Sequence, residues 1–385
     1  MRKAFKFRLF PNRSQAAALD ATLEQHRRLY NLALRERRDV YEAEERSVSY
    51  GEQSARFKQA RKATPSLGIL NFSAGQATLR RLDRSFKAFF RRVKSGEIPG
   101  YPRFKPEDRF RTVEFPSYGD GCRLKDNGRL YLQNIGHIKV KQHRPIEGAI
   151  KTVSFSKSCG KWYAIFSCDL GDAPEPAGDG MAVGIDLGLK AFFVTSDGTS
   201  VEPPRYYRKS QKKLRRAQRS LARKKKGSIR RGKSRHRVAK LHEKTANQRR
   251  DFHHKEARRL VDAHGLIVHE SLNVKGIART RLAKSTYDAG WASFLDILAG
   301  KAEYAGVRVV AVDPRNTTQA CSACGAMPEV KKTLSDRMHV CSCGYVSDRD
   351  MNAALNILHL GRGLRLRDGT QRVAASVSRE AVCFS

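Results

Sequence analysis

The stretch Met181-Ala182-Val183-Gly184-Ile185-Asp186-Leu187-Gly188 decides the fold of the second half of the chain. Its apolar run ends at one carboxylate and a glycine, and a second apolar run, residues 191–195, precedes the turn Ser196-Asp197-Gly198. Short apolar runs bounded by turn residues are typical of buried strands. The pattern therefore predicts a β-hairpin whose first strand carries Asp186 near its end.

Two more carboxylates occupy comparable places further along the chain. Glu270 closes the apolar run 266–269, and Asp350 stands where a helix to about residue 360 is expected to begin. A carboxylate at the end of an apolar element is costly unless it meets a cation, and paired Mg²⁺ ions about 4 Å apart need several such oxygens. Taken singly, Asp186 also fits a turn residue, Glu270 an ion pair, and Asp350 a helix cap. Taken together, in the order hairpin, strand and helix, they predict an RNase H-like metal nuclease core.

Four of the eight cysteines form a second pattern. Two residues separate Cys321 from Cys324, sixteen residues follow, and Cys341 and Cys343 then form a tighter pair. Two such pairs can close a tetrahedron of thiolates around Zn²⁺. Four unrelated buried thiols, or His339 in the place of one cysteine, are the alternatives. The spacing predicts a structural zinc site in a reducing compartment, because four protein ligands leave no open position for water.

The charge of the chain indicates its partner. The 385 residues include 76 Lys and Arg against 38 Asp and Glu, which gives a net charge of +38 at pH 7, while 40% hydrophobic residues suffice for packed cores. Residues 205–259 alone hold 24 Lys or Arg and 3 acids, and we expect two long solvated helices there, joined near residues 227–232. Such a surplus binds phosphates, and Tyr206, Tyr207 and Phe252 could stack on bases. The balance favours nucleic acid over small acidic metabolites; a solvated helix pair without a ligand is the alternative.

The first half of the chain has its own organisation. Residues 4–9 alternate as a strand does, helices are expected to about residue 94, and residues 96–106 are rich in turn signals. Residues 112–170 contain short β runs, and 171–180 read as a linker. No apolar run reaches 18 residues, so we expect no transmembrane helix, and the start has no apolar signal core, so we expect a cytoplasmic protein.

Seven short motifs, taken together, match one family. They are Phe7-Arg8-Leu9-Phe10-Pro11, Tyr101-Pro102-Arg103-Phe104-Lys105, Gly184-Ile185-Asp186-Leu187-Gly188, the basic helices, Glu270-Ser271-Leu272-Asn273-Val274-Lys275-Gly276, Thr317-Thr318-Gln319-Ala320-Cys321-Ser322-Ala323-Cys324-Gly325, and Asp348-Arg349-Asp350-Met351-Asn352-Ala353-Ala354. On these motifs the chain, to about residue 360, resembles TnpB, the transposon-encoded RNA-guided nuclease family similar to type V CRISPR effectors.

The resemblance implies an α/β fold with β-barrel and helical parts. Residues 181–315 and 346–360 would form the RNase H-like (RuvC) nuclease core, with a zinc ribbon inserted at 316–345. Residues 1–10 and 107–180 would form a wedge β-barrel, and 11–106 a helical recognition domain. We expect residues 361–385 to be a disordered tail.

The resemblance also implies a function: an RNA-guided DNA endonuclease of an insertion sequence, which cuts beside a short target-adjacent motif by two-metal-ion hydrolysis. Asp186, Glu270 and Asp350 would be the catalytic triad and would hold two Mg²⁺ ions, for which Mn²⁺ could substitute, while the four cysteines would hold Zn²⁺. Ser73 and Gln76 would lie near the target-adjacent motif. The cations expected to contact nucleic acid are Lys212, Lys213, Arg215, Arg216, Arg219, Arg223, Lys224, Lys225, Arg230 and Arg231.

The expected partners are a guide RNA derived from the transposon end and a double-stranded DNA target, with one RNA per monomer and no membrane. Two other functions stay open. A guide-independent DNA strand-transfer enzyme or resolvase would use the same acids. A guided DNA-binding repressor would not cut, and the intact triad argues against it.

Overall fold

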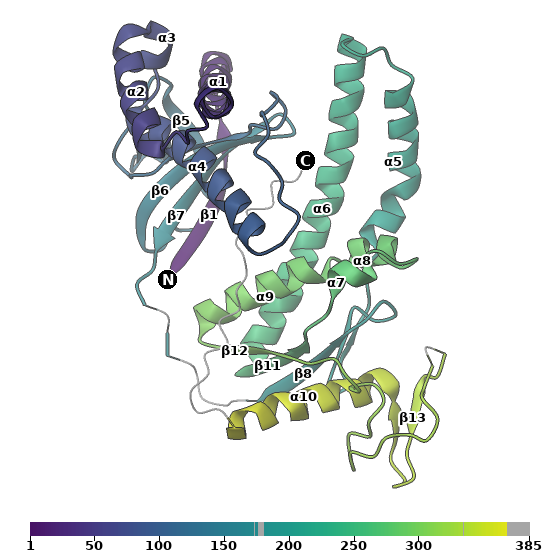
Figure 1. The fold of residues 1–385 in the computed structure, drawn as a ribbon. Coiled ribbons are helices and arrows are strands. Elements are labelled where there is room, and N and C mark those ends of the chain that lie inside the picture. The colour runs from purple at the N-terminus through teal and green to yellow at the C-terminus, as the bar shows by residue number, and fades with distance from the viewer. Residues whose placement is uncertain (173, 176–180, 334, 368–385) are drawn as a thin grey trace. The chain divides into compact units, whose positions relative to one another are not determined.

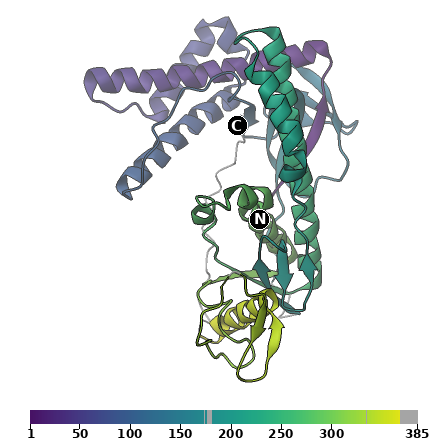
Figure 2. The same cartoon turned by 90° about the vertical axis from the view of Figure 1, so that its right-hand side faces the viewer.

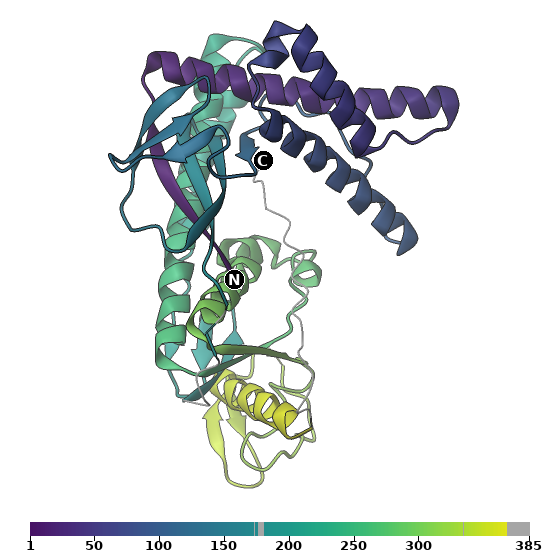
Figure 3. The same cartoon turned by 90° about the vertical axis from the view of Figure 1, so that its left-hand side faces the viewer.

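The computed structural model describes residues 1–172, 174–175, 181–333 and 335–367, with backbone alone at residues 66 and 364–367. The described chain forms two compact units that divide after Asp172 (Figures 1, 2 and 3). Each unit has its own hydrophobic core. The three candidate carboxylates and the four candidate cysteines all lie in the second unit.

A curved, half-barrel sheet of seven antiparallel strands forms the centre of the first unit (Figure 3). The N-terminal strand β1 lies in its middle, paired with β7 on one side and β5 on the other. Phe5, Phe7 and Leu9 alternate along β1 and are buried, as expected. In the order β2-β6-β7-β1-β5-β4-β3, the strands are Thr112–Phe115, Ala149–Ser158, Lys161–Asp169, Arg2–Phe10, Gly136–Lys141, Arg129–Leu132 and Cys122–Leu124.

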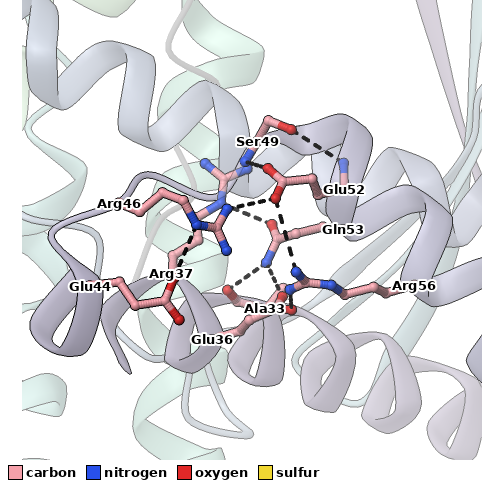
Figure 4. A network of polar contacts seen from close by, with 9 residues as sticks. All are labelled: Ala33, Glu36, Arg37, Glu44, Arg46, Ser49, Glu52, Gln53 and Arg56. Carbon is pink, nitrogen blue, oxygen red and sulfur yellow. Dashed lines mark hydrogen bonds and ion pairs between the residues drawn. The ribbon is translucent and has the colours of Figure 1, made fainter. Parts of the chain in front are cut away.

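Four helices complete the first unit. Helix α1 begins with a capping box, in which Asn12 accepts from the backbone N–H of Gln15 and the Gln15 side chain accepts from the backbone N–H of Asn12. Helix α2 is held on α1 by polar contacts: Gln53 Nε2 donates to Ala33 O over 2.8 Å, and Arg56 pairs with Glu36 (Figure 4). The helices are α1 (Arg13–Glu44), α2 (Tyr50–Ala63), α3 (Pro65–Gly68) and α4 (Phe72–Lys94).

The second unit is built on a five-stranded mixed sheet in the order β10-β9-β8-β11-β12. Strands β8 and β9 form the expected antiparallel hairpin, while β11 pairs in parallel with both β8 and β12. This arrangement is the RNase H-like topology, and the predicted fold class is confirmed. The strands are β8 (Ala182–Leu187), β9 (Phe193–Thr195), β10 (Ser200–Val201), β11 (Leu266–Glu270) and β12 (Arg308–Val312).

Helices cover both faces of this sheet (Figure 1). Val183, Ile185 and Ile267 point to one face, where they pack with residues of α6 and α9. Leu266 and Val268 point to the other face, where they pack with Ile357 and Leu358 of α10. The remaining elements are α5 (Tyr206–Ala222), α6 (Ile229–Ala263), α7 (Val274–Ile277), α8 (Ala283–Ala289), α9 (Trp291–Ala305), β13 (Met338–Val340), β14 (Val346–Asp348) and α10 (Arg349–Arg367).

The structure corrects two details of the sequence interpretation. Helix α8, and helix α9, which packs on the sheet, were not foreseen. Helix α10 continues to Arg367, so the first seven residues of the expected tail are helical, because Gly361 allows the helix to lie against Val268 of β11. The rest of that tail, residues 368–385, lies outside the described chain. None of the described helices combines the length and the apolar character that a bilayer-spanning segment needs.

A glycine-to-alanine exchange tests the contact between α10 and the sheet. A Cβ on Gly184 would lie 2.1 Å from Ala354 O and 2.8 Å from Leu358 N, both of them backbone atoms. We expect Gly184→Ala to lower the free energy of unfolding by about 2 kcal/mol or more, measured by urea unfolding. The matched control is Gly300→Ala in α9, where an added Cβ meets no described atom within 4 Å, so its stability should stay equal or rise slightly. Equal stabilities of the two variants would contradict the contact.

Candidate active site and zinc site

Strand pairing brings Asp186 and Glu270 together. The parallel register of β8 and β11 runs to Ile185 opposite His269, and the next residue on each strand is Asp186 and Glu270. Side chains alternate along a strand, so Asp186 shares the face of Gly184, and Glu270 shares the face of Val268. That face is the one covered by α10. Neighbouring strands are about 4.8 Å apart, so the two carboxylates start from adjacent backbone positions.

Helix packing adds Asp350 to this face. Gly184 touches Ala354 of α10, and Asp350 lies one helical turn before Ala354. Asp186, two residues after Gly184, therefore lies beside the first turn of α10. The cap of that helix is Asp348, whose Oδ1 accepts the backbone N–H of Asp350 over 2.8 Å. Asp350 is thus not the cap, and its carboxylate pairs with the Arg349 guanidinium instead.

The pKa of Asp186 shows that the three carboxylates interact. Burial, followed by the charges of Glu270 and Asp350, raises the pKa of Asp186 to about 7. Burial also raises the pKa of Glu270, while a hydrogen bond from Thr317 acts in the opposite direction. Arg349 donates to Asp350 Oδ1 over 3.1 and 3.2 Å. Burial and neighbouring negative charge disfavour the ionised form of Asp186, and a divalent cation would relieve that cost. In the part of the chain that the structure describes, the three carboxylates are not all within 4.8 Å of one another, as the four thiols are.

A cleft opens beside Asp350. Its volume is about 590 Å³, and charged side chains of both signs line it. Lys190, Arg205 and Lys209 supply positive charge, while Glu202, Asp348 and Asp350 supply negative charge. Charges of both signs suit a phosphodiester that approaches a metal-binding carboxylate, because the cations meet the phosphate oxygens. None of these three cations was singled out from the sequence.

The four cysteines come together as the spacing predicts. Among the described residues, their Sγ atoms form the one group of potential ligands in which all lie within 4.8 Å of one another. The Sγ atoms of Cys321 and Cys343 are 3.8 Å apart, and those of Cys324 and Cys341 are 3.5 Å apart. Zn–S bonds of about 2.3 Å place tetrahedral sulfur atoms about 3.8 Å apart. The cluster therefore fits a zinc ribbon.

The two turns that carry the cysteines are built alike. Gly325 and Gly344 follow the second cysteine of each pair with φ of 77° and 86°, a conformation that favours glycine. His339 is not part of the cysteine cluster; its Nδ1 contacts the Lys332 ammonium instead. Strand β14 of the ribbon leads directly into α10, so one residue, Arg349, separates the end of that strand from Asp350.

The predicted cations of the basic helices lie on α5, α6 and their connection. All of them are exposed except Lys224 and Arg231, which are half-buried. Arg231 donates to the carbonyls of Leu221 and Lys224 over 3.2 and 2.9 Å, so it closes the turn between the helices. Phe252 is partly buried and packs on Phe192 at 4.9 Å between ring centroids, against the core of the second unit.

Sequence reasoning missed the polar side chains around the carboxylates. Thr317, before the first cysteine, donates to the Glu270 carboxylate. On α10, Asn352 donates to the carbonyl of Ala320, and Asn356 donates to the carbonyl of Thr317. The signal was present: two asparagines four residues apart interrupt the apolar face of α10 formed by Ala353, Ala354, Ile357 and Leu358. Buried amides at this spacing point to a bound backbone segment.

Comparisons with known proteins assign the chain to a family. Models described as "Probable transposase", "Cas12f1-like, TNB domain" and "Helix-turn-helix domain" match residues 165–281, 291–357 and 1–46. Two relatives named "Putative RNA-guided DNA endonuclease" come from Escherichia coli (strain K12), with the added name InsQ, and from Streptomyces pristinaespiralis. The Escherichia coli protein is 30% identical, and the match covers 94% of this chain and 93% of that protein. The Streptomyces protein is 34% identical, and the match covers 94% of this chain and 90% of that protein. The chain belongs to the TnpB family.

A CRISPR-associated endodeoxyribonuclease Cas12f1 from Sulfoacidibacillus thermotolerans is more distant from this TnpB member. It is 27% identical over 75% of this chain and 76% of its own. The match to a helix-turn-helix model has a different structural counterpart here, since residues 1–46 form strand β1 and the single long helix α1.

Loss of one cysteine tests the zinc site. Cys324→Ser should reduce bound zinc from about one ion per chain to near zero, because serine replaces a thiolate ligand, as measured by inductively coupled plasma mass spectrometry. Cys159→Ser in the first unit changes the same atom outside the cluster and should leave the zinc content unchanged. Equal zinc in both variants would contradict the assignment.

The raised pKa of Asp186 predicts a free energy of unfolding that depends on pH. Between about pH 4 and pH 7 the folded chain binds more protons than the unfolded chain, so this carboxyl lowers the free energy of unfolding as the pH rises. Without divalent ions at pH 8, Asp186→Asn should raise the free energy of unfolding by up to about 4 kcal/mol, and the gain should vanish near pH 4.

The control for this stability measurement is Asp251→Asn on the exposed surface of α6. It should change the free energy of unfolding by less than about 0.5 kcal/mol. A gain from Asp186→Asn that is absent at pH 8, or that does not depend on pH, would mean that the three carboxylates do not repel one another.

Proposed function

We propose that this TnpB-family chain is an RNA-guided DNA endonuclease that cuts its target by metal-ion-dependent phosphodiester hydrolysis. The observation that supports the proposal is the convergence of Asp186, Glu270 and Asp350 on the α10-covered face of an RNase H-like sheet. The names of the two relatives that span the chain support the same activity.

The three carboxylates would hold two divalent ions. Asp186 would be the ligand shared by the two ions, and Glu270 and Asp350 would complete the ligand sets. When bound, two Mg²⁺ ions activate the attacking water and stabilise the leaving 3′ oxygen. Arg349 would keep the Asp350 carboxylate oriented through its two hydrogen bonds. The protein thus contributes positioned oxygens on a rigid sheet and helix.

The cleft beside Asp350 is the proposed path of the DNA strand that is cut. Lys190, Arg205 and Lys209 would bind phosphates there. Their positive charge would offset the repulsion between the DNA backbone and the acidic cluster, so that the strand can approach Asp350.

The guide RNA and the heteroduplex are the proposed partners of the exposed cations of α5 and α6. Sequence would then be read by base pairing, and the protein would read backbone shape and a short flanking duplex. Ser73 and Gln76 on α4 are the residues proposed to lie near the target-adjacent motif, and both are half-buried. Gln76 also donates to Ser54 Oγ over 3.0 Å, so it would keep this bond or exchange it for one to DNA. We further propose that the guide RNA derives from the transposon end and that one RNA binds each monomer. The domain limits given in the sequence analysis are proposed as well, and the complex would act on chromosomal DNA in a prokaryotic cytoplasm.

Removal of the bridging carboxylate tests the proposed function. In the complex purified with its RNA, Asp186→Ala should lower the rate of DNA cleavage at least about 10³-fold, because no other group replaces the shared ligand. Binding of the target, measured by filter retention in the presence of Ca²⁺, should change less than about twofold. The matched control, Asp251→Ala on α6, should cleave at the wild-type rate.

The same preparation distinguishes the alternatives. Ribonuclease treatment before DNA is added should abolish specific cleavage, and retained strand transfer or junction cutting would instead favour a guide-independent enzyme. A wild-type complex that binds its target but never nicks it in Mg²⁺ or Mn²⁺ would favour a repressor. Full cleavage by Asp186→Ala would refute the site.

A further inference from the structure

Thr317 lies between two of the elements that carry carboxylates. Its side chain is 3% exposed, and its hydroxyl donates to Oε1 of Glu270, which is itself 8% exposed. The same hydroxyl lies 3.1 Å from the carbonyl of Pro314. A hydroxyl has one hydrogen to donate, and a carboxylate is a stronger acceptor than a neutral carbonyl. Thr317 therefore fixes one oxygen of Glu270.

The backbone at Thr317 is held by α10. Asn356 Nδ2 donates to the carbonyls of Thr317 over 2.9 Å and of Ala320 over 2.8 Å, which uses both of its hydrogens. One turn earlier on the helix, Asn352 is fully buried and donates to the same Ala320 carbonyl over 2.8 Å. Its Oδ1 accepts the backbone N–H of Ser322 over 2.9 Å.

These bonds connect three parts of the site that are far apart in the sequence. Glu270 is at the end of β11, Asp350 is in the first turn of α10, and Cys321 lies inside the turn held by the two asparagines. Displacement of that turn along α10 would move the Thr317 hydroxyl away from Glu270. The position of the Glu270 carboxylate is therefore set by the helix that carries Asp350.

We propose that Thr317 is a positioning residue for the divalent-ion site: it holds Oε1 of Glu270 and leaves Oε2 for a divalent ion, and Asn356 holds Thr317 in register with α10. The proposal rests on the proposed function of the three carboxylates. It assigns the segment before the first zinc turn a task in the nuclease centre, in addition to leading into the zinc ribbon. Partners of this kind, one shell outside the ligands, commonly change metal affinity about 10- to 100-fold.

The test is Mn²⁺ binding by the full-length, zinc-loaded chain, followed by electron paramagnetic resonance of free Mn²⁺. Thr317→Val keeps the shape of the side chain and removes the hydroxyl, and we expect Mn²⁺ affinity to fall about tenfold or more. Thr317→Ser restores a hydroxyl and should bind Mn²⁺ within about twofold of wild type. Thr318→Val makes the same exchange on the adjacent, half-buried residue and should leave Mn²⁺ binding unchanged.

Zinc content and the unfolding midpoint are measured on every variant, so a folding defect is recognised. If Thr317→Val loses zinc, Thr317→Ala takes its place, with the same expected loss of Mn²⁺ affinity. A zinc-loaded, folded variant without the hydroxyl that binds Mn²⁺ as wild type does overturns the positioning role, as does a Thr317→Ser variant as weak as Thr317→Val.

Asp186→Ala separates this proposal from the proposed function. If Asp186→Ala loses Mn²⁺ binding while Thr317→Val keeps it, the ion site is supported and the role of Thr317 is wrong. If Asp186→Ala binds Mn²⁺ as tightly as wild type, the ion site itself is wrong, and the role of Thr317 falls with it.

Discussion

Helix α10 rests directly on strand β8 because Gly184 has no side chain. Any larger residue there would meet the backbone of α10 at Ala354 and Leu358. This contact determines which end of the helix lies near Asp186, and so it places Asp350 beside a carboxylate that is 164 positions earlier in the chain. The second close contact, Gly361 against Val268, fixes the direction of α10 across β11. The two glycines therefore set the position of α10 on the sheet, and this position places the Asp350 carboxylate near the end of β8.

The site formed in this way works against stability. Asp186 lies among like charges in a buried setting, and its pKa of about 7 measures how unfavourable its ionised form is. In a chain of net charge +38, the carboxylates could have been paired with cations, yet the cation bonded to Asp350 is Arg349 of the same helix turn. Other cations, Lys190, Arg205 and Lys209, line the adjacent cleft. We infer that the carboxylate oxygens remain available to metal ions and that the cleft cations meet an incoming phosphate.

Much of this arrangement could be predicted from the sequence, because the decisive signals are local. The alternation in β1, the apolar run that ends at Asp186 and the cysteine spacing each depend on neighbouring residues. Helix α9 is apolar on average, and its length is a helical signal in the sequence, but it carries none of the candidate site residues. The bonds of Thr317, Asn352 and Asn356 could not be predicted in the same way. They depend on which backbone carbonyls face α10, and only the folded chain brings residues 317–322 against that helix. The structural role of Arg231 could not be predicted either, because in the sequence it is one of many neighbouring cations, and only the folded chain shows its bonds to the carbonyls of Leu221 and Lys224.

Anomalous scattering from crystals of the full chain soaked in Mn²⁺ tests most directly whether Asp186, Glu270 and Asp350 share one divalent-ion centre. We expect two Mn²⁺ peaks about 4 Å apart, with carboxylate oxygens of Asp186 within bonding distance of both and those of Glu270 and Asp350 bonded to one or the other. Peaks that involve one of these residues alone, or that lie elsewhere while the three carboxylates bind no ion, would contradict it.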